Sequence, residues 1–189
     1  TSGETHLRHR VTADGFYKTG DIVEEMSDGY IRIVDRKKGL MVLDTGKNVA
    51  SNKIEGKFSL SKWIETVVPI GSERKFVSAL VIPNMDAFVQ LFDKEKIPYN
   101  KDKVVRVTDP MPMVAEVGQD FIDHPRLKAL IDSDIQSVNL ELEDYEKIKK
   151  YTILSRKLSI QDGDMTPTLK VKRKFVIDKY KEKIDKMYI

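Results

Sequence analysis

Residues 63–83 read WIETVVPIGSERKFVSALVIP and hold two apolar runs that flank a short polar stretch. Both runs are rich in valine and isoleucine, a composition typical of buried strands. Gly71 and Ser72 lie between the runs and are common turn residues. The stretch therefore predicts two successive strands, over 63–71 and 75–83.

The segments before this pair predict further short elements. Residues 21–35 read DIVEEMSDGYIRIVD, in which an Asp-Gly dipeptide separates two partly alternating runs, so we expect a β-hairpin. The run GLMVLDTGKNV at 39–49 is apolar but broken at Gly46, which can take a positive φ. Asn52 and Glu55 have the spacing of a capping box and predict the start of a helix.

The segments after the pair alternate between helical and strand patterns. Asn84 is expected to cap a helix over 85–95, with Phe88, Leu91 and Phe92 on one side. The pattern then predicts strand-like residues at 104–107, a helix over about 123–150, a strand at 151–160 and a closing helix over 173–189. The apolar stripe of that last helix is expected to consist of Phe175, Ile177, Tyr180, Ile184 and Met187. Such a mixture of elements indicates the α+β or α/β class.

The composition suits a globular domain. Hydrophobic residues make up 40% of the 189 residues and charged residues 33%, intermixed, which argues against global disorder. Cysteine is absent, which excludes a disulfide framework and a cysteine nucleophile. No apolar run approaches the roughly 20 residues that span a bilayer. The histidines His6, His9 and His124 are scattered, so no metal site is predicted.

The net charge of +3 is unevenly distributed. Residues 166–189 contain eight Lys/Arg and three Asp/Glu, a local charge of +5, which leaves −2 for the rest. A solvated helix face is the simplest interpretation of such a basic tail. The alternative is a surface that binds phosphates, nucleic acid or an anionic membrane.

Three short motifs follow one another along the chain: TGD at 19–21, DRKKG at 35–39 and TPTLKVKR at 166–173. In this order, and with GKNVASNKIE at 46–55, they resemble the C-terminal part of adenylate-forming enzymes, which include acyl-CoA synthetases, luciferases and peptide-synthetase adenylation domains. Many of those enzymes carry SGK at the last lysine. TPTLK, and the extra helical material over about 84–150, are similar to the long-chain fatty acid:CoA ligases.

This resemblance implies an α+β fold, a small mixed sheet of short strands flanked by helices and preceded by a β-hairpin. Residues 1–35 would be the tail of the large AMP-binding domain, and residues 36–189 the mobile C-terminal domain with an insertion at about 84–150. The phosphate loop, the acyl tunnel and the glutamate that binds magnesium would lie upstream of this chain. We therefore expect a piece of a larger protein that is inactive alone.

The resemblance also implies an activity. Long-chain fatty acid:CoA ligases first join a fatty acid to AMP from ATP and then transfer the acyl group to CoA. The full-length enzyme would need ATP, CoA and Mg²⁺, with no ligand expected on the fragment. The partners would be these small molecules and the N-terminal domain, without nucleic acid. The expected location is cytoplasmic, with peripheral membrane association as a hypothesis.

The motifs assign roles to four residues. Lys170 would be the catalytic lysine, because an ammonium group can stabilise the charge that builds up during adenylate formation. Asp21 would bind the ribose, since a carboxylate accepts hydrogen bonds from both hydroxyls. Asp35 would be the hinge, and Arg36 a phosphate or ribose contact.

The glycine loop is the expected CoA-binding segment. Gly46 would let the backbone approach the pantetheine arm, with Lys47 and Asn48 beside it. Lys37 and Lys38 are interpreted as solvated, and Trp63 as a packing residue.

Other classes of function remain open at this stage. Another adenylate-forming ligase could act on aryl or medium-chain acids. A non-enzymatic module could use the basic tail to bind nucleic acid or a membrane. A dimerisation domain is also compatible with the sequence.

Overall fold

The computed structural model describes residues 12–36, 39–108 and 112–189. The chain divides into two units, Thr1–Leu40 and Met41–Ile189, and each is described by itself. His6, His9, Lys37 and Lys38 lie outside the described residues.

The first unit contains the hairpin that the sequence predicts. Strands β1 (Asp21–Glu25) and β2 (Ile31–Arg36) pair antiparallel, with an irregularity in register between Ile22 and Val23. The connecting turn is closed by a hydrogen bond of 2.8 Å from the Met26 N–H to the Tyr30 carbonyl. The polar dipeptide between the two runs therefore produces the turn that its residue types favour.

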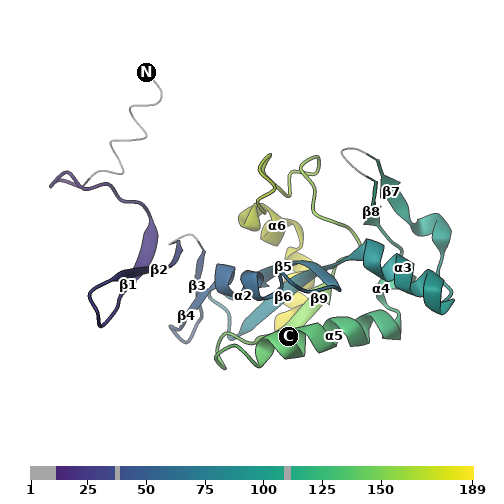
Figure 1. Ribbon diagram of the computed structural model, residues 1–189, viewed down its shortest axis with the longest axis horizontal. Helices are drawn as coiled ribbons and strands as arrows, with labels where there is room; N and C mark the ends of the chain where they lie inside the picture. Colours follow the sequence, from purple (N-terminus) through teal and green to yellow (C-terminus); the bar gives the residue numbers. More distant parts are fainter. Residues whose placement is uncertain (1–11, 37–38, 109–111) are drawn as a thin grey trace, which may run out of the picture. The chain divides into compact units, whose positions relative to one another are not determined.

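The second unit is built on a mixed sheet of three strands. Strand β5 (Ile64–Ile70) pairs antiparallel with β6 (Val77–Pro83), and β6 pairs parallel with β9 (Ile148–Ile153). Helices lie around this sheet in Figure 1. The predicted α+β class with a small mixed sheet is confirmed.

Both faces of the sheet are covered, because alternate residues of its strands point to opposite faces. Val67, Ala79 and Val81 belong to a first core that also includes residues of α2 (Ser51–Lys57), α3 (Met85–Glu95) and α5 (Pro125–Asn139). The alternating residues Val68 and Leu80 belong to a second core. That core is completed by α6 (Arg173–Lys179), α7 (Lys181–Asp185) and η2 (Lys186–Tyr188).

Two further strand pairs flank this arrangement. Strands β3 (Leu40–Val42) and β4 (Asn48–Ala50) form a small sheet before α2. Strands β7 (Val105–Val107) and β8 (Met113–Glu116) pair antiparallel between η1 (Lys101–Lys103) and α4 (Gln119–Ile122). The sequence predicted the strand character of β7 but missed its partner and the short helix α4.

Residues of α3, α4 and the segments beside them form an aromatic cluster. Phe92 is fully buried, and its ring centroid lies 4.6 Å from that of Phe121 and 4.9 Å from that of His124. His124 also caps α5, since its Nδ1 accepts a hydrogen bond of 3.1 Å from the Arg126 N–H. This packing explains the presence of His124 without a metal. Trp63 lies 4.9 Å from Phe88 and packs as predicted.

The predicted helix over 123–150 is wrong in its second half. Helix α5 ends at Asn139, and β9 begins at Ile148, three residues before the predicted strand. The buried amide of Asn139 donates 3.0 Å to the Ile148 carbonyl and accepts 2.9 Å from its N–H. The Asn139 side chain thus bonds both backbone groups of Ile148, as a neighbouring strand would, and β9 begins at that residue.

Two other helix predictions need correction. Helix α2 begins at Ser51 after Ala50, without a side-chain cap, so the predicted capping box is wrong. The closing segment is broken at Tyr180 into α6 and α7, because Tyr180 leaves the helical conformation. Val176 is buried in place of the expected Phe175, which is 46% exposed. The predicted cap of α3 is confirmed by a hydrogen bond of 3.2 Å from the Ala87 N–H to Asn84 Oδ1.

Stability of the second unit should fall at high pH because of Tyr151. Its hydroxyl on β9 donates to the Asp132 carboxylate on α5, and burial first, then this bond, raises the pKa of Tyr151 above 10. A raised pKa contributes stability that is complete below pH 10 and is lost as the pH rises through the folded-state pKa. Between pH 9 and 12, the free energy of unfolding measured in urea should therefore fall less steeply with pH in Tyr151→Phe than in the unmodified protein. The two slopes should differ by less than about 1 kcal/mol per pH unit. An identical slope in both proteins would contradict this prediction.

Candidate functional site

Lys170 lies at the end of a tight hairpin with a defined hydrogen-bond pattern. The Thr166 N–H donates 2.8 Å to the Lys170 carbonyl, and the Leu169 N–H donates 2.9 Å to the Thr166 carbonyl. The hydroxyl of Thr166 accepts 3.1 Å from the Lys170 N–H. Pro167 fixes one backbone angle inside this turn, because its ring restricts φ. The backbone of Lys170 is therefore ordered while its side chain is exposed.

The glycine loop has the same hairpin geometry. The Leu43 N–H donates 2.9 Å to the Lys47 carbonyl, and the Gly46 N–H donates 2.9 Å to the Leu43 carbonyl. In both hairpins the residue before the lysine is left-handed, with φ of 78° at Gly46 and 58° at Leu169. Both loops thus use a turn followed by one left-handed residue, and both present an exposed lysine after it.

The two hairpins predict opposite effects of substitution at the left-handed position. Glycine adopts this conformation freely, whereas other residues lose about 1–2 kcal/mol. Leu169→Gly should stabilise the second unit by about 0.5–1 kcal/mol, because the greater freedom of glycine in the unfolded chain offsets part of the gain. Gly46→Ala should destabilise it by about 1 kcal/mol, although an added Cβ would meet no described atom within 4 Å. Urea unfolding of both variants would test this pair, and equal signs would contradict it.

In the first unit, Asp21 and Arg36 lie opposite each other on β1 and β2, and Ile22 lies opposite Asp35. The Asp21 N–H donates a hydrogen bond of 3.2 Å to the Thr19 hydroxyl. The side chains of Asp35 and Arg36 are outside the described part of the structure. The backbone thus brings the two predicted nucleotide-binding residues to neighbouring positions, an arrangement that the sequence did not predict.

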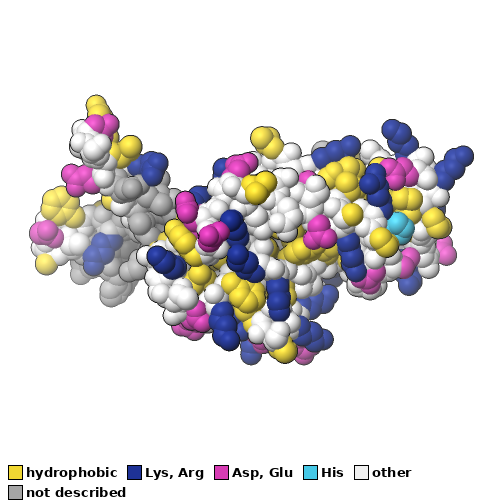
Figure 2. All heavy atoms as spheres, turned by 90° about the horizontal axis from the view of Figure 1, so that it is seen from below, with side chains coloured by type: hydrophobic (Ala, Val, Ile, Leu, Met, Phe, Trp, Pro, Cys, Tyr) yellow, Lys and Arg dark blue, Asp and Glu magenta, His cyan; other side chains and the backbone are white. Residues whose placement is uncertain are grey.

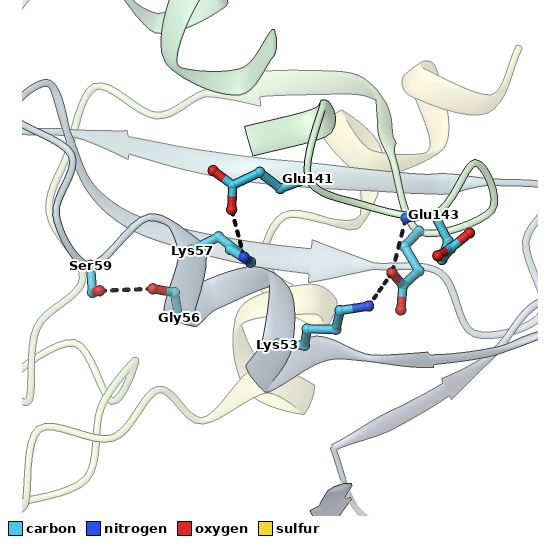
Figure 3. Close-up of polar contacts among 7 residues, drawn as sticks. Lys53, Gly56, Lys57, Ser59, Glu141 and Glu143 are labelled. Atoms are coloured by element: carbon cyan, nitrogen blue, oxygen red, sulfur yellow. Dashed lines mark hydrogen bonds and ion pairs between the residues drawn. The ribbon is translucent and has the colours of Figure 1, made fainter. Parts of the chain in front are cut away.

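Helix α2 follows the glycine loop and is fixed by ion pairs to two other segments. Its Lys57 forms an ion pair with Glu141 at 2.6 Å (Figure 3), and its Lys53 forms one with Glu146 at 2.5 Å. Both glutamates follow α5 in the chain. On the other side, its Glu55 pairs at 2.5 Å with Arg173, the first residue of α6. The helix after the glycine loop is therefore connected directly to the segment that follows Lys170.

Asp164 lies at the base of the Lys170 hairpin and is completely buried. Its Oδ1 accepts 2.7 Å from the Lys179 ammonium, and its Oδ2 accepts 3.3 Å from the Ser159 N–H. Asp164 and Glu55 were not predicted from the sequence as parts of the site. Only its position in the sequence, two residues before Thr166 of the hairpin motif, could have indicated a role for Asp164.

The chain resembles known proteins in sequence and in fold. No protein-family model matches the chain. A long-chain-fatty-acid–CoA ligase of Mycobacterium tuberculosis is 33% identical over 175 residues, which cover 93% of this chain and 27% of that protein. This chain is similar in sequence to part of the long-chain-fatty-acid–CoA ligases. It spans about a quarter of the length of the curated ligases that it matches.

Solved structures support the same fold. The adenylation domain of a carboxylate reductase from Mycobacterium chelonae matches 98% of this chain with a TM-score of 0.71 at 23% identity, over 25% of that domain. The corresponding domain from Segniliparus rugosus, solved with AMP and a carboxylic acid, matches 96% of this chain with a TM-score of 0.68 at 25% identity, over 24% of that protein. The chain thus has the fold of the C-terminal domain of adenylate-forming enzymes.

Basic, acidic and apolar side chains are intermixed on one face of the structure, as Figure 2 shows. Three charged residues of the basic tail are engaged in internal ion pairs: Arg173 with Glu55, Lys179 with Asp164, and Asp185 with Arg74 at 2.6 Å. Part of the tail's charge thus holds the fold together.

The described residues contain no group of three or more acidic or histidine side chains that could hold a metal ion. Within the same described ranges, no helix has the length and apolar character needed to cross a membrane.

Proposed function

We propose that this chain works as the C-terminal part of a long-chain-fatty-acid–CoA ligase. In the first half-reaction, an oxygen of the fatty acid carboxylate attacks the α-phosphate of ATP, and pyrophosphate leaves. In the second, the thiol of CoA attacks the carbonyl of the acyl-adenylate, its proton passes to solvent, and AMP leaves. ATP, CoA and Mg²⁺ are the ligands of the complete protein, and the chain alone is inactive.

The observation that carries the proposal is the ordered hairpin at Lys170. An exposed ammonium group on a fixed backbone can enter a site formed by another part of the protein. There it would stabilise negative charge on the α-phosphate and on the attacking oxygen as the new bond forms. Such stabilisation is effective because the group is positioned before the reaction begins.

The remaining site residues would divide the binding of the nucleotide and CoA. Asp21 would accept hydrogen bonds from the ribose hydroxyls, and Arg36, its neighbour across the hairpin, would contact phosphate or ribose. Asp35 would absorb the dihedral change between two poses of the C-terminal domain. The hairpin at Gly46, with Lys47 and Asn48, would lie against the pantetheine arm of CoA.

This proposal explains the basic tail better than a phosphate-polymer module does. Arg173 and Lys179 form ion pairs inside the fold, which reduces the charge available to a polyanion. The acid is proposed to be long-chain because the curated relatives carry that name.

The direct test is to replace Lys170 by alanine in the full-length protein. The two half-reactions would be measured separately, as palmitate-dependent release of pyrophosphate and as thioester formation from supplied palmitoyl-adenylate and CoA. The variant should lose the first activity and keep the second. If both survive unchanged, Lys170 is not the adenylation lysine. If the unmodified full-length protein shows neither activity, the proposed function is wrong.

A further inference from the structure

The carboxylate of Asp164 is the most deeply buried acidic group among the described residues of the second unit. Its side chain is 1% exposed, and each of its two oxygens accepts one hydrogen bond, from Lys179 and from the Ser159 backbone. Removing a carboxylate from water is costly unless it is paired and hydrogen-bonded. Such a group is retained either for stability or for the geometry that it imposes.

The backbone of Asp164 begins the ladder that ends at Lys170. Its carbonyl accepts 2.8 Å from the Lys172 N–H, Met165 bridges to Val171, and the Thr166 N–H bonds the Lys170 carbonyl at 2.8 Å. Asp164 is therefore the base of a two-stranded hairpin whose other end carries Lys170.

The side chain of Asp164 connects this hairpin to the helix that follows it. Lys179 is the last residue of α6, a helix that begins directly after Lys172 and packs Val176 into the second core. The ion pair closes a loop from the base of the hairpin to the far end of that helix. The orientation of the hairpin is thereby fixed to the sheet.

We propose that Asp164 is a positioning residue for Lys170 in acyl-adenylate formation and that Lys179 is the partner through which it acts. This inference rests on the proposed function of Lys170. Neither side chain touches the substrates; the pair sets the direction in which the hairpin projects.

The geometry makes Lys170 sensitive to this pair. The pair formed by Thr166 and Lys170 lies two residues along the strand from Asp164, which corresponds to about 6.6 Å. A rotation of the hairpin by about 10° at Asp164 would therefore move the Lys170 backbone by about 1 Å. A misplacement of about 1 Å can lower a rate by about 100-fold when catalysis depends on alignment. The glycine loop lies on a different hairpin, so this rotation should not affect the transfer of the acyl group to CoA.

The two partners should differ in their response to substitution. Asp164→Asn keeps the shape of the side chain and leaves Lys179, 31% exposed, able to be solvated. Lys179→Met leaves a buried carboxylate without its cation, which is the more damaging change. Lys179→Arg keeps the charge and should recover part of the activity.

The experiment measures both half-reactions in the full-length protein and takes their ratio. Asp164→Asn should lower palmitate-dependent pyrophosphate release by about 10- to 100-fold and thioester formation from palmitoyl-adenylate by less than about twofold. Lys179→Met should lower palmitate-dependent pyrophosphate release more than Asp164→Asn does. The double variant should release pyrophosphate no more slowly than Lys179→Met alone. Non-additivity of this kind identifies two residues that act as one unit.

Asp120→Asn is the matched control. Asp120 on α4 likewise has a lysine ammonium at Oδ1, Lys103 at 3.7 Å, and accepts at Oδ2 from a backbone N–H, that of Asn100 at 3.2 Å, but these partners do not belong to either lysine hairpin. Its loss should leave the ratio of the half-reactions unchanged even if it lowers stability. The same assays on Lys170→Ala show whether the hairpin lysine acts at all.

The outcomes separate the two claims. If Lys170→Ala loses adenylation but Asp164→Asn does not, or if Asp164→Asn lowers both half-reactions equally, the positioning role is wrong and the proposed function stands. If Lys170→Ala keeps adenylation, the catalytic role of Lys170 fails and the positioning role fails with it. If the unmodified full-length protein has neither half-reaction, the proposed function fails. The proposal is supported if Asp164→Asn selectively loses adenylation and if Lys179→Arg retains more of that activity than Lys179→Met does.

Discussion

Phe92→Ala should lower the free energy of unfolding of the second unit by about 3–5 kcal/mol. Phe92 is fully buried on α3, and its ring lies 4.6–6.4 Å from four other rings, those of Phe88, Tyr99, Phe121 and His124. Truncation removes the transfer free energy of the ring and leaves a cavity that these neighbours can fill only partly. Urea unfolding followed by circular dichroism would measure the loss.

Leu140→Ala is the control for this prediction. Leu140 follows α5 and is 86% exposed, so its truncation should change stability by less than about 0.5 kcal/mol. A loss of under 1 kcal/mol for Phe92→Ala would mean that the aromatic cluster rearranges freely. In that case the segment from α3 to α5 would not be part of one well-packed core.

The sequence was most informative where burial is complete. Residues of β6 are all buried, so a run that is apolar except for Ser78 identified the strand without alternation. The cap at Asn84 was also predictable, because a local side-chain bond depends only on neighbours in sequence. The Asn52 capping box failed because α2 already begins at Ser51, and Glu55 pairs with Arg173, 118 residues later.

Long-range contacts also limited the prediction of helix ends. The periodic pattern of α5 continues to Leu142, which is buried, but the chain has already left the helix. The bonds between Asn139 and Ile148 start β9 early, and β9 must pair with β6, far away in sequence. A local pattern could not reveal either constraint.

The candidate site shows the same division. The motif around Lys170 was visible in sequence, and the left-handed backbone at Leu169 was not, because leucine rarely adopts it. The burial of Asp164 was equally hidden, since a single acidic residue in a polar stretch is usually solvated. The roles of Asp21, Asp35, Arg36 and the glycine loop stay predictions.

Lys170→Ala should lower the rate of palmitoyl-adenylate formation by about 100-fold or more, equivalent to about 2.7 kcal/mol of transition-state stabilisation. The loss should appear mainly in kcat, because the ammonium group interacts with charge that develops during the reaction. Lys170→Arg retains the charge but replaces a compact ammonium group with a larger forked one, so recovery should be partial.

Lys174→Ala is the matched control for that loss, since Lys174 is another exposed lysine four residues further along, on α6. Its removal lowers the local positive charge by the same amount, and adenylation should stay within about twofold of the unmodified protein. If Lys174→Ala reduces adenylation as strongly as Lys170→Ala does, the general field of the basic tail is responsible. If only Lys170→Ala does so, the effect belongs to one ammonium group held by one hairpin, as the fixed bonds between Thr166 and Lys170 require.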